Sequence, residues 1–332
     1  MEEFLSYNDV ALVPQYNNIE SRNDPDISTW LTNKTRIKTP LVPANMDTVI
    51  GRDLAQVLIE NGGIPIFHRY SSFEEQIQLV TEFRGQCFIS CGLSKYEQTK
   101  KLLEAGARGV NVDVSYAHSL ATLNFIRKLR ADFPDKEIIA GNVCTVQGYN
   151  DLVNAGCNAV KVNVGPGAAC TTRIKTGFGL PTFTTVQKIG KVAQKLRIPI
   201  IADGGIVYEK DMAIAIAAGA STVMCGKLFV QTAESASSKV DINGRLYCKY
   251  RGLASAEFQT DHYGGLKPGT VAEGVSMDLP VLETAQELID RFNGAFKSAL
   301  TYGGARDIKE FQRKAEFVRV TNNYIPESHP RL

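Results

Sequence analysis

The sequence has few of the residues from which metal centres and disulfide frameworks are built. Its 332 residues include four histidines, which stand apart from one another, and seven cysteines, no two of which have CxxC spacing. A zinc site therefore has little support. Because the cysteines are odd in number and scattered, a disulfide framework is not expected either, and we predict reduced thiols in a cytoplasmic setting.

The sequence also lacks long apolar runs and an excess of charge of one sign. No apolar run approaches the ~20 residues that a membrane helix needs, and the acidic N-terminus MEEFLSYNDV is unlike a secretory signal. The formal net charge is only +2, so nothing favours nucleic acid or a membrane as a partner. With 44% hydrophobic and 22% charged residues, the composition is that of an ordinary soluble globular protein.

Eight short apolar runs alternate with amphipathic stretches of helical period, which predicts βαβ units and a parallel sheet. Eight units match a closed barrel, whereas a doubly wound sheet more often has about five to seven strands. We therefore predict an α/β fold, a single (β/α)8 TIM barrel, with one catalytic domain over residues 1–332 and no inserted regulatory domain. The expected strands are Pro40–Ala44, Ile64–His68, Cys87–Cys91, Gly109–Val114, Glu137–Asn142, Ala159–Val164, Pro199–Asp203 and Ser221–Cys225.

Polar or glycine-bearing segments follow six of these runs. Barrel enzymes keep their chemistry at the carboxyl ends of the strands, so these segments are expected to share one face. They are Asn45–Asp47, Asp113, Gly141–Asn142, Gly165–Cys170, Asp203–Gly205 and Gly226.

After the eighth run the pattern changes. Residues 231–280 contain a hairpin signal at Asn243-Gly244 and a glycine-rich stretch at 262–269. We expect this region to be a flap inserted before the last helix, which is predicted at Val281–Leu300.

The most informative segment is the glycine-rich loop Gly165–Arg173, which contains Cys170. Glycines let the backbone turn sharply and approach a ligand closely. An exposed Cys170 thiolate there would be a nucleophile, with Thr172 relaying a proton. A structural turn that carries an incidental cysteine is the alternative.

Two further loops predict a phosphate site. The loops after strands seven and eight of such barrels commonly hold phosphate, and here they read Asp203-Gly204-Gly205 and Cys225-Gly226-Lys227. Glycine N–H groups can cradle phosphate oxygens, and the Asp203 carboxylate suits a ribose diol.

Together these residues resemble the IMP dehydrogenase/GMP reductase family. The motifs that carry the resemblance are Pro43–Val49, Ala140–Val143, Gly165–Arg173, Ile201–Ile206 and Ala272–Gly274. The resemblance implies that Cys170 attacks C2 of a purine nucleotide, that Thr172 assists departure of the C2 substituent, and that Glu273 is the general acid/base partner.

The resemblance also implies the binding residues. For the cofactor these are Asp113, Ser115 and Asn142, and Arg69 is a candidate for the 2′-phosphate of NADPH, with a surface ion pair as the alternative. Backbone carbonyls of Gly165, Gly167 and Cys170 bind a monovalent cation, K⁺, in some members, and a homotetramer is implied. For the nucleotide substrate the residues are Met46, Asp203, Gly204, Gly205, Gly226, Lys227, Leu253, Ala254 and Gly274.

Two branches of this family remain open. The direct run from Phe73–Arg84 to Cys87, and a flap without arginine between Phe258 and Glu273, favour the reductase, which converts GMP and NADPH to IMP, ammonia and NADP. Tyr250-Arg251-Gly252 is closer to the dehydrogenase, which oxidises IMP with NAD, and His262 is a candidate hydrolytic base there. A nucleotide-binding barrel without turnover is a third reading.

Overall fold

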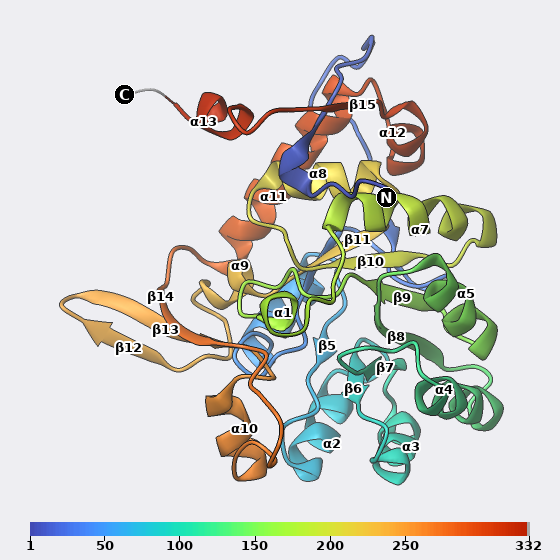
Figure 1. Ribbon diagram of the computed structural model, residues 1–332, viewed down its shortest axis with the longest axis vertical. Coiled ribbons are helices and arrows are strands. Elements are labelled where there is room, and N and C mark those ends of the chain that lie inside the picture. Colours follow the sequence, from blue (N-terminus) through green and yellow to red (C-terminus); the bar gives the residue numbers. More distant parts are fainter. Residues whose placement is uncertain (331–332) are drawn as a thin grey trace.

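The computed structural model describes residues 1–330, and its centre is an eight-stranded parallel sheet rolled into a (β/α)8 barrel (Figure 1). The strands hydrogen-bond in the order β4-β11-β10-β9-β8-β7-β6-β5, so the first two barrel strands along the chain lie at the two ends of this order. The predicted fold class is confirmed. The barrel strands are β4 Leu41–Pro43, β5 Ile66–Phe67, β6 Phe88–Cys91, β7 Gly109–Asp113, β8 Glu137–Val143, β9 Ala159–Val162, β10 Ile200–Asp203 and β11 Thr222–Cys225.

Alternation along each strand separates two apolar layers. On β10, Ile201 packs inside the barrel with Met224 and Phe88, whereas Ile200 and Ala202 pack outward against the helices. Because both faces of a parallel barrel strand are buried, each strand reads as a continuous apolar run.

Helices surround this sheet, and three of those between barrel strands begin at a residue whose side chain caps the helix. Ser72, Ser119 and Thr145 each accept a hydrogen bond from a backbone N–H of the first turn, which satisfies a group that the helix itself leaves unpaired. The helices between barrel strands are α1 Arg52–Glu60, α2 Phe73–Glu82, α3 Tyr96–Ala105, α4 Leu120–Asp132, α5 Val146–Ala155, α6 Thr172–Thr176, α7 Thr182–Leu196 and α8 Glu209–Ala217.

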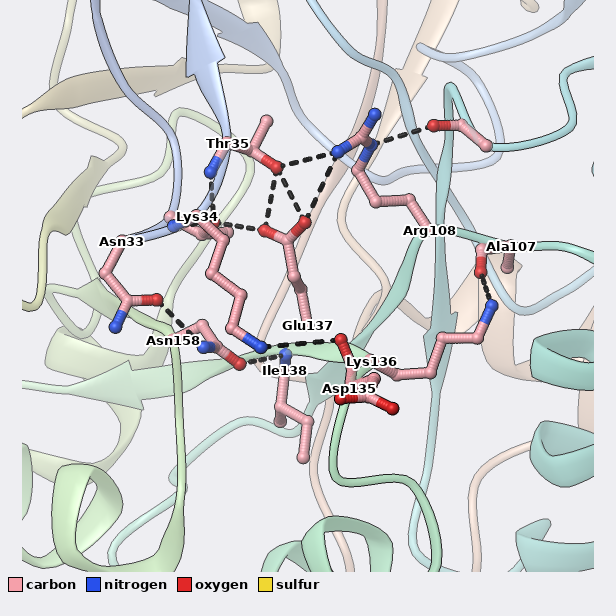
Figure 2. Close-up of polar contacts among 12 residues, drawn as sticks. Asn33, Lys34, Thr35, Ala107, Arg108, Asp135, Lys136, Glu137, Ile138 and Asn158 are labelled. Carbon is pink, nitrogen blue, oxygen red and sulfur yellow. Dashed lines mark hydrogen bonds and ion pairs between the residues drawn. The ribbon is translucent and has the colours of Figure 1, made fainter.

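The amino-terminal end of the barrel is closed by a polar cluster around Glu137, the first residue of β8 (Figure 2). Its carboxylate accepts hydrogen bonds from the hydroxyls of Thr32 and Thr35, which lie in the turn between β2 (Thr29–Trp30) and β3 (Arg36–Ile37). Arg108 lies 3.5 Å from the carboxylate and also donates a 3.2 Å hydrogen bond to the Thr35 hydroxyl. This end of a barrel supports stability rather than chemistry.

The region after β11 contains the predicted hairpin and a helix that the sequence did not predict. Strands β12 (Lys239–Ile242) and β13 (Arg245–Arg251) pair across Asn243-Gly244, and β14 (Ser276–Pro280) adds a third strand. Short helices α9 (Lys227–Val230) and α10 (Ala256–Tyr263) flank them. Ser255 caps the start of α10, and Gly264, with φ +74°, ends it. Figure 1 shows the β12–β13 hairpin projecting away from the barrel.

The helix predicted at Val281–Leu300 runs from Ala285 to Tyr302 (α11), slightly later than predicted. Beyond it lie α12 (Ile308–Lys314), β15 (Phe317–Arg319) and α13 (Tyr324–Ser328). Strand β15 pairs antiparallel with β1 (Val10–Leu12), which follows the 3₁₀ turn Tyr7–Asp9. Within residues 1–330, no helix combines the length and the apolar character needed to cross a bilayer.

Candidate active site

The chain after β9 carries Cys170 and Thr172, and these two side chains form a hydrogen-bonded series with Glu273 of the flap. The Cys170 thiol lies 3.2 Å from the hydroxyl oxygen of Thr172. That hydroxyl donates a 2.8 Å hydrogen bond to Oε2 of Glu273. A thiol, a hydroxyl and a carboxylate in series form a path along which a proton can move from sulfur to carboxylate and back.

Backbone hydrogen bonds fasten this loop to the flap. The N–H of Thr171 donates to the carbonyl of Glu273 (2.8 Å), and the N–H of Val275 donates to the carbonyl of Ala169 (2.9 Å). A Cβ on Gly274 would lie 3.0 Å from the Ala169 carbonyl oxygen, so any larger residue at position 274 would be crowded against the cysteine loop. The carbonyl of Ala254, in turn, accepts from the N–H of Glu273 (3.0 Å). Leu253, Ala254 and Gly274 are thereby gathered beside the cysteine.

The two predicted phosphate loops lie at the same end of the barrel. Gly204 and Gly205 have positive φ of +81° and +79°, and a Cβ on Gly204 would lie 3.1 Å from the backbone N of Gly167 in the cysteine loop. A Cβ on Gly226 would lie 2.5 Å from the Tyr250 hydroxyl oxygen and 3.4 Å from the sulfur of Met46. These predicted residues therefore line one region.

Lys227 differs from the other predicted substrate residues because its side chain is exposed at the start of α9. Its contact with phosphate stays a prediction.

The side chain of Asp203, at the end of β10, is hydrogen-bonded by the side-chain amide of Asn142. Its Oδ2 accepts a 2.8 Å hydrogen bond from Nδ2 of Asn142, and the same Nδ2 lies 3.0 Å from the carbonyl oxygen of Asn163. Burial raises the pKa of the Asp203 carboxyl, while the charge of Lys161 and the amide of Asn142 act in the opposite direction. The carboxylate has free acceptor positions for a diol.

The predicted cofactor residues lie beside this group. Asp113 is the last residue of β7, the strand next to β8, which carries Asn142. Ser115 is exposed in the loop after β7. Arg69 follows β5, and its guanidinium carbon lies 4.7 Å from the ring centre of Tyr70. One guanidinium nitrogen of Arg69 would be 2.8 Å from a Cβ on Gly92, so Arg69 extends across the end of β6.

The predicted cation site has the geometry of a tight loop. Gly165 has φ +87°, and the Gly167 carbonyl accepts a 2.9 Å hydrogen bond from the N–H of Cys170. A carbonyl oxygen has two lone pairs, so the Gly167 oxygen can accept this hydrogen bond and still bind a cation. Binding of K⁺ to Gly165, Gly167 and Cys170 stays a prediction.

Sequence reasoning missed two charged residues of the site. Lys161 is fully buried on β9 and contacts Asp113, and Arg251 joins Asp47 to α10. A signal for Lys161 was present, because a lysine inside the apolar run Ala159–Val162 must find a buried partner. Nothing local signalled the partners of Arg251, which come from two distant segments.

His262, the candidate hydrolytic base, packs into an aromatic cluster. Its ring stacks on Phe258 with centroids 4.1 Å apart at 15°, and meets Tyr70 edge-on at 5.5 Å. Its Nδ1 lies 3.2 Å from the carbonyl oxygen of Phe258, one turn earlier in α10.

A barrel whose strand ends gather a cysteine, a threonine–glutamate pair and two glycine loops belongs to a narrow class of (β/α)8 proteins. A family model described as the IMP dehydrogenase / GMP reductase domain matches residues 4–331. The chain therefore belongs to the IMP dehydrogenase/GMP reductase family, as its motifs indicated.

Relatives of both kinds are similar to this chain. A GMP reductase of Staphylococcus carnosus is 35% identical over 328 residues, which are 97% of this chain and 98% of that protein. A GMP reductase of Vibrio atlanticus is 32% identical over 95% of this chain and 94% of its own. An IMP dehydrogenase of Aquifex aeolicus is 40% identical over 247 residues, 73% of this chain, and the alignment spans 50% of that protein's length. Identity alone does not separate the two activities.

Proposed function

We propose that this protein is a GMP reductase, which converts GMP and NADPH to IMP, ammonia and NADP through a covalent adduct on Cys170. The observation that carries the proposal is the continuous hydrogen-bonded path from Cys170 through Thr172 to Glu273. Reductive deamination needs a nucleophile and a proton donor for the departing nitrogen, and this path supplies both.

The chain's residues divide the reaction as follows. Thr172 and Glu273 take the proton of the Cys170 thiol as sulfur bonds to C2 of GMP. The same pair returns protons to the exocyclic nitrogen, so that the C2–N bond breaks and ammonia leaves. Bound NADPH supplies the hydride to C2. The C2–S bond then breaks, and the Cys170 thiolate is regenerated as IMP leaves.

The cofactor residues fit a nicotinamide dinucleotide. Asp113 and Asn142, on the neighbouring strands β7 and β8, lie beside the substrate residue Asp203, where the nicotinamide must lie to reach C2. Arg69 beyond them would bind the 2′-phosphate, because a guanidinium matches phosphate geometry.

Two observations favour the reductase over the dehydrogenase. Helix α2 runs to β6 through residues 83–87 alone, whereas the alignments with three of the matched IMP dehydrogenases cover only 48–50% of those proteins. In addition, the flap has no arginine between Phe258 and Glu273, and the ring of its His262 packs against Phe258 and Tyr70.

A dehydrogenase is the second candidate, and Arg251 is the observation in its favour. Tyr250-Arg251-Gly252 stands at the end of β13, and Arg251 reaches α10, the helix on which a mobile hydrolytic flap would be built.

The experiment follows nicotinamide absorbance with purified protein in two mixtures, GMP with NADPH and IMP with NAD. We expect absorbance to fall in the first, with IMP appearing, and to stay constant in the second. A rise in the second, with xanthosine monophosphate as product, would establish the dehydrogenase instead.

The Cys170→Ala variant is the control for the covalent step. It should lose turnover by about a thousandfold or more while still binding GMP in calorimetry. If the unaltered protein binds GMP and turns over neither mixture, the protein is a nucleotide-binding barrel rather than an enzyme.

A further inference from the structure

A lysine lies inside the barrel beneath the candidate active site. Lys161, in the middle of β9, pairs in register with Ile201, which points into the barrel, and its side chain is 2% exposed. Ammonium groups are almost never buried without partners, because removing a full charge from water is costly. The partners of Lys161 therefore define its role.

Two carboxylates from different strands share this ammonium. Nζ of Lys161 lies 2.6 Å from Oδ1 of Asp113 on β7 and 3.8 Å from Oδ2 of Asp203 on β10. It also lies 3.3 Å from the amide oxygen of Asn45. One positive charge is thus divided between the carboxylate assigned to the cofactor and the carboxylate assigned to the ribose of the substrate.

The barrel is built to make room for this lysine. Gly141 on the neighbouring strand β8 stands directly against the backbone and Cβ of Lys161, and any side chain at position 141 would collide with it. Gly141 is also the register partner of Asp113. Burial acts to lower the pKa of Lys161, but the two carboxylates outweigh burial and raise it, so the ammonium stays charged.

We propose that Lys161 is a positioning residue that serves as the shared counter-ion of Asp113 and Asp203, and thereby couples nucleotide binding to dinucleotide binding. This inference rests on the proposed function for the identity of the two ligands. Without Lys161, two partly buried carboxylates lose the positive charge that they share, and each becomes a weaker and less ordered acceptor for its ligand.

The test compares the unaltered protein with Lys161→Met, which keeps most of the side-chain volume and removes the charge. Calorimetry measures the Kd of GMP, IMP and NADPH separately, so turnover is not required. We expect the Kd of the nucleotide and of NADPH each to rise about tenfold to a hundredfold, because removing one member of a buried ion pair leaves the other charges uncompensated. Lys191→Met, which removes an exposed lysine of α7, should change neither Kd.

A second substitution separates charge balance from packing. Asp113→Asn added to Lys161→Met removes one of the two uncompensated carboxylates. The double variant should regain nucleotide affinity toward the unaltered value, while NADPH affinity stays low because Asp113 itself is gone. If Asp113→Asn instead adds to the loss of nucleotide affinity, Lys161 only fills space and the proposal is wrong.

Folding gives an independent readout. If Lys161→Met alone does not fold, a folded double variant supports the proposal, and failure of both to fold overturns it. If the unaltered protein binds neither GMP nor IMP, the proposed function fails. The thermal midpoint then decides the inference: Lys161→Met should lower it, and added Asp113→Asn should raise it again.

Discussion

The hydroxyl of Thr172 donates a 2.8 Å hydrogen bond to the carboxylate of Glu273, although 101 residues separate them in the chain. Thr172 is the first residue of α6, after the loop that follows β9, and Glu273 lies in the flap before β14. The backbone bond from Thr171 to the Glu273 carbonyl holds the two segments in this relation. The reactive group of the site therefore depends on how the flap docks.

Because Thr172 and Glu273 act as one relay, their substitutions should not add. Thr172→Val and Glu273→Gln are each expected to lower kcat by about a hundredfold to ten-thousandfold, the usual contribution of general acid–base catalysis. The double variant should be little worse than the more damaged single variant.

Steady-state kinetics with GMP and NADPH check the relay, with Thr270→Val, an exposed flap threonine, as the control. Multiplicative losses in the double variant would show that the two residues act independently.

Arg251 should hold α10 against the barrel. Its guanidinium lies 2.6 Å from Asp47 in the loop after β4 and 2.5 Å from Asp261 in α10, with the side chain 12% exposed. Arg251→Met should make the amides of α10 exchange with solvent about tenfold faster or more, which corresponds to the loss of about 1–3 kcal/mol of local stability.

Hydrogen exchange read by mass spectrometry measures this opening. Arg245→Met, which removes an exposed arginine from the same strand, is the matched control. Equal exchange in α10 for both variants would mean that the aromatic contacts of Phe258 hold the helix without Arg251.

Glu137 should stabilise the barrel without affecting its chemistry. Glu137→Gln replaces by an amide the carboxylate that accepts hydrogen bonds from two threonine hydroxyls in a buried cluster (Figure 2). The weaker hydrogen bonds should lower the free energy of unfolding by about 1–3 kcal/mol.

Denaturant unfolding measures this loss beside Glu104→Gln, which alters an exposed glutamate of α3 and should be neutral. Turnover by folded Glu137→Gln should equal that of the unaltered protein, because Glu137 lies at the opposite end of the strands from Cys170. A large loss of kcat in the folded variant would contradict this separation.

His68 should make stability depend on pH. Burial lowers the pKa of His68 from its usual value of 6.5; the nearby carboxylates of Asp47 and Glu75 raise it, and His262 lowers it. The folded state thus holds His68 neutral, with Nδ1 accepting a 3.2 Å hydrogen bond from the N–H of Tyr70. Below about pH 6.5 only the unfolded chain gains the proton, so stability should be lost as the pH falls, by at most about 1.4 kcal/mol per pH unit.

Unfolding curves at several pH values test this dependence. His68→Gln should flatten the profile below pH 6.5, whereas His329→Gln, an exposed histidine near the C-terminus, should leave it unchanged. An identical slope in His68→Gln would assign the pH dependence to other groups.

Sequence signals that are local in the chain predicted their structures well. The eight apolar runs each became a barrel strand, and the Asn243-Gly244 turn became a hairpin. Helix α10 was not predicted, because glycines 264, 265 and 269 indicate a flexible loop in that segment. Ser255 nevertheless caps a helix that ends before these glycines.

The sequence by itself determined the barrel and the cysteine loop, because apolar periodicity and glycine conformation act within a few residues. Only the tertiary structure decided that Thr172 meets Glu273, that Lys161 lies between Asp113 and Asp203, and that Arg251 joins Asp47 to α10. These contacts join segments far apart in the chain, and no local pattern encodes which buried charge will meet which. The closure of the barrel, which brings the carboxyl ends of its strands to one face, makes that choice.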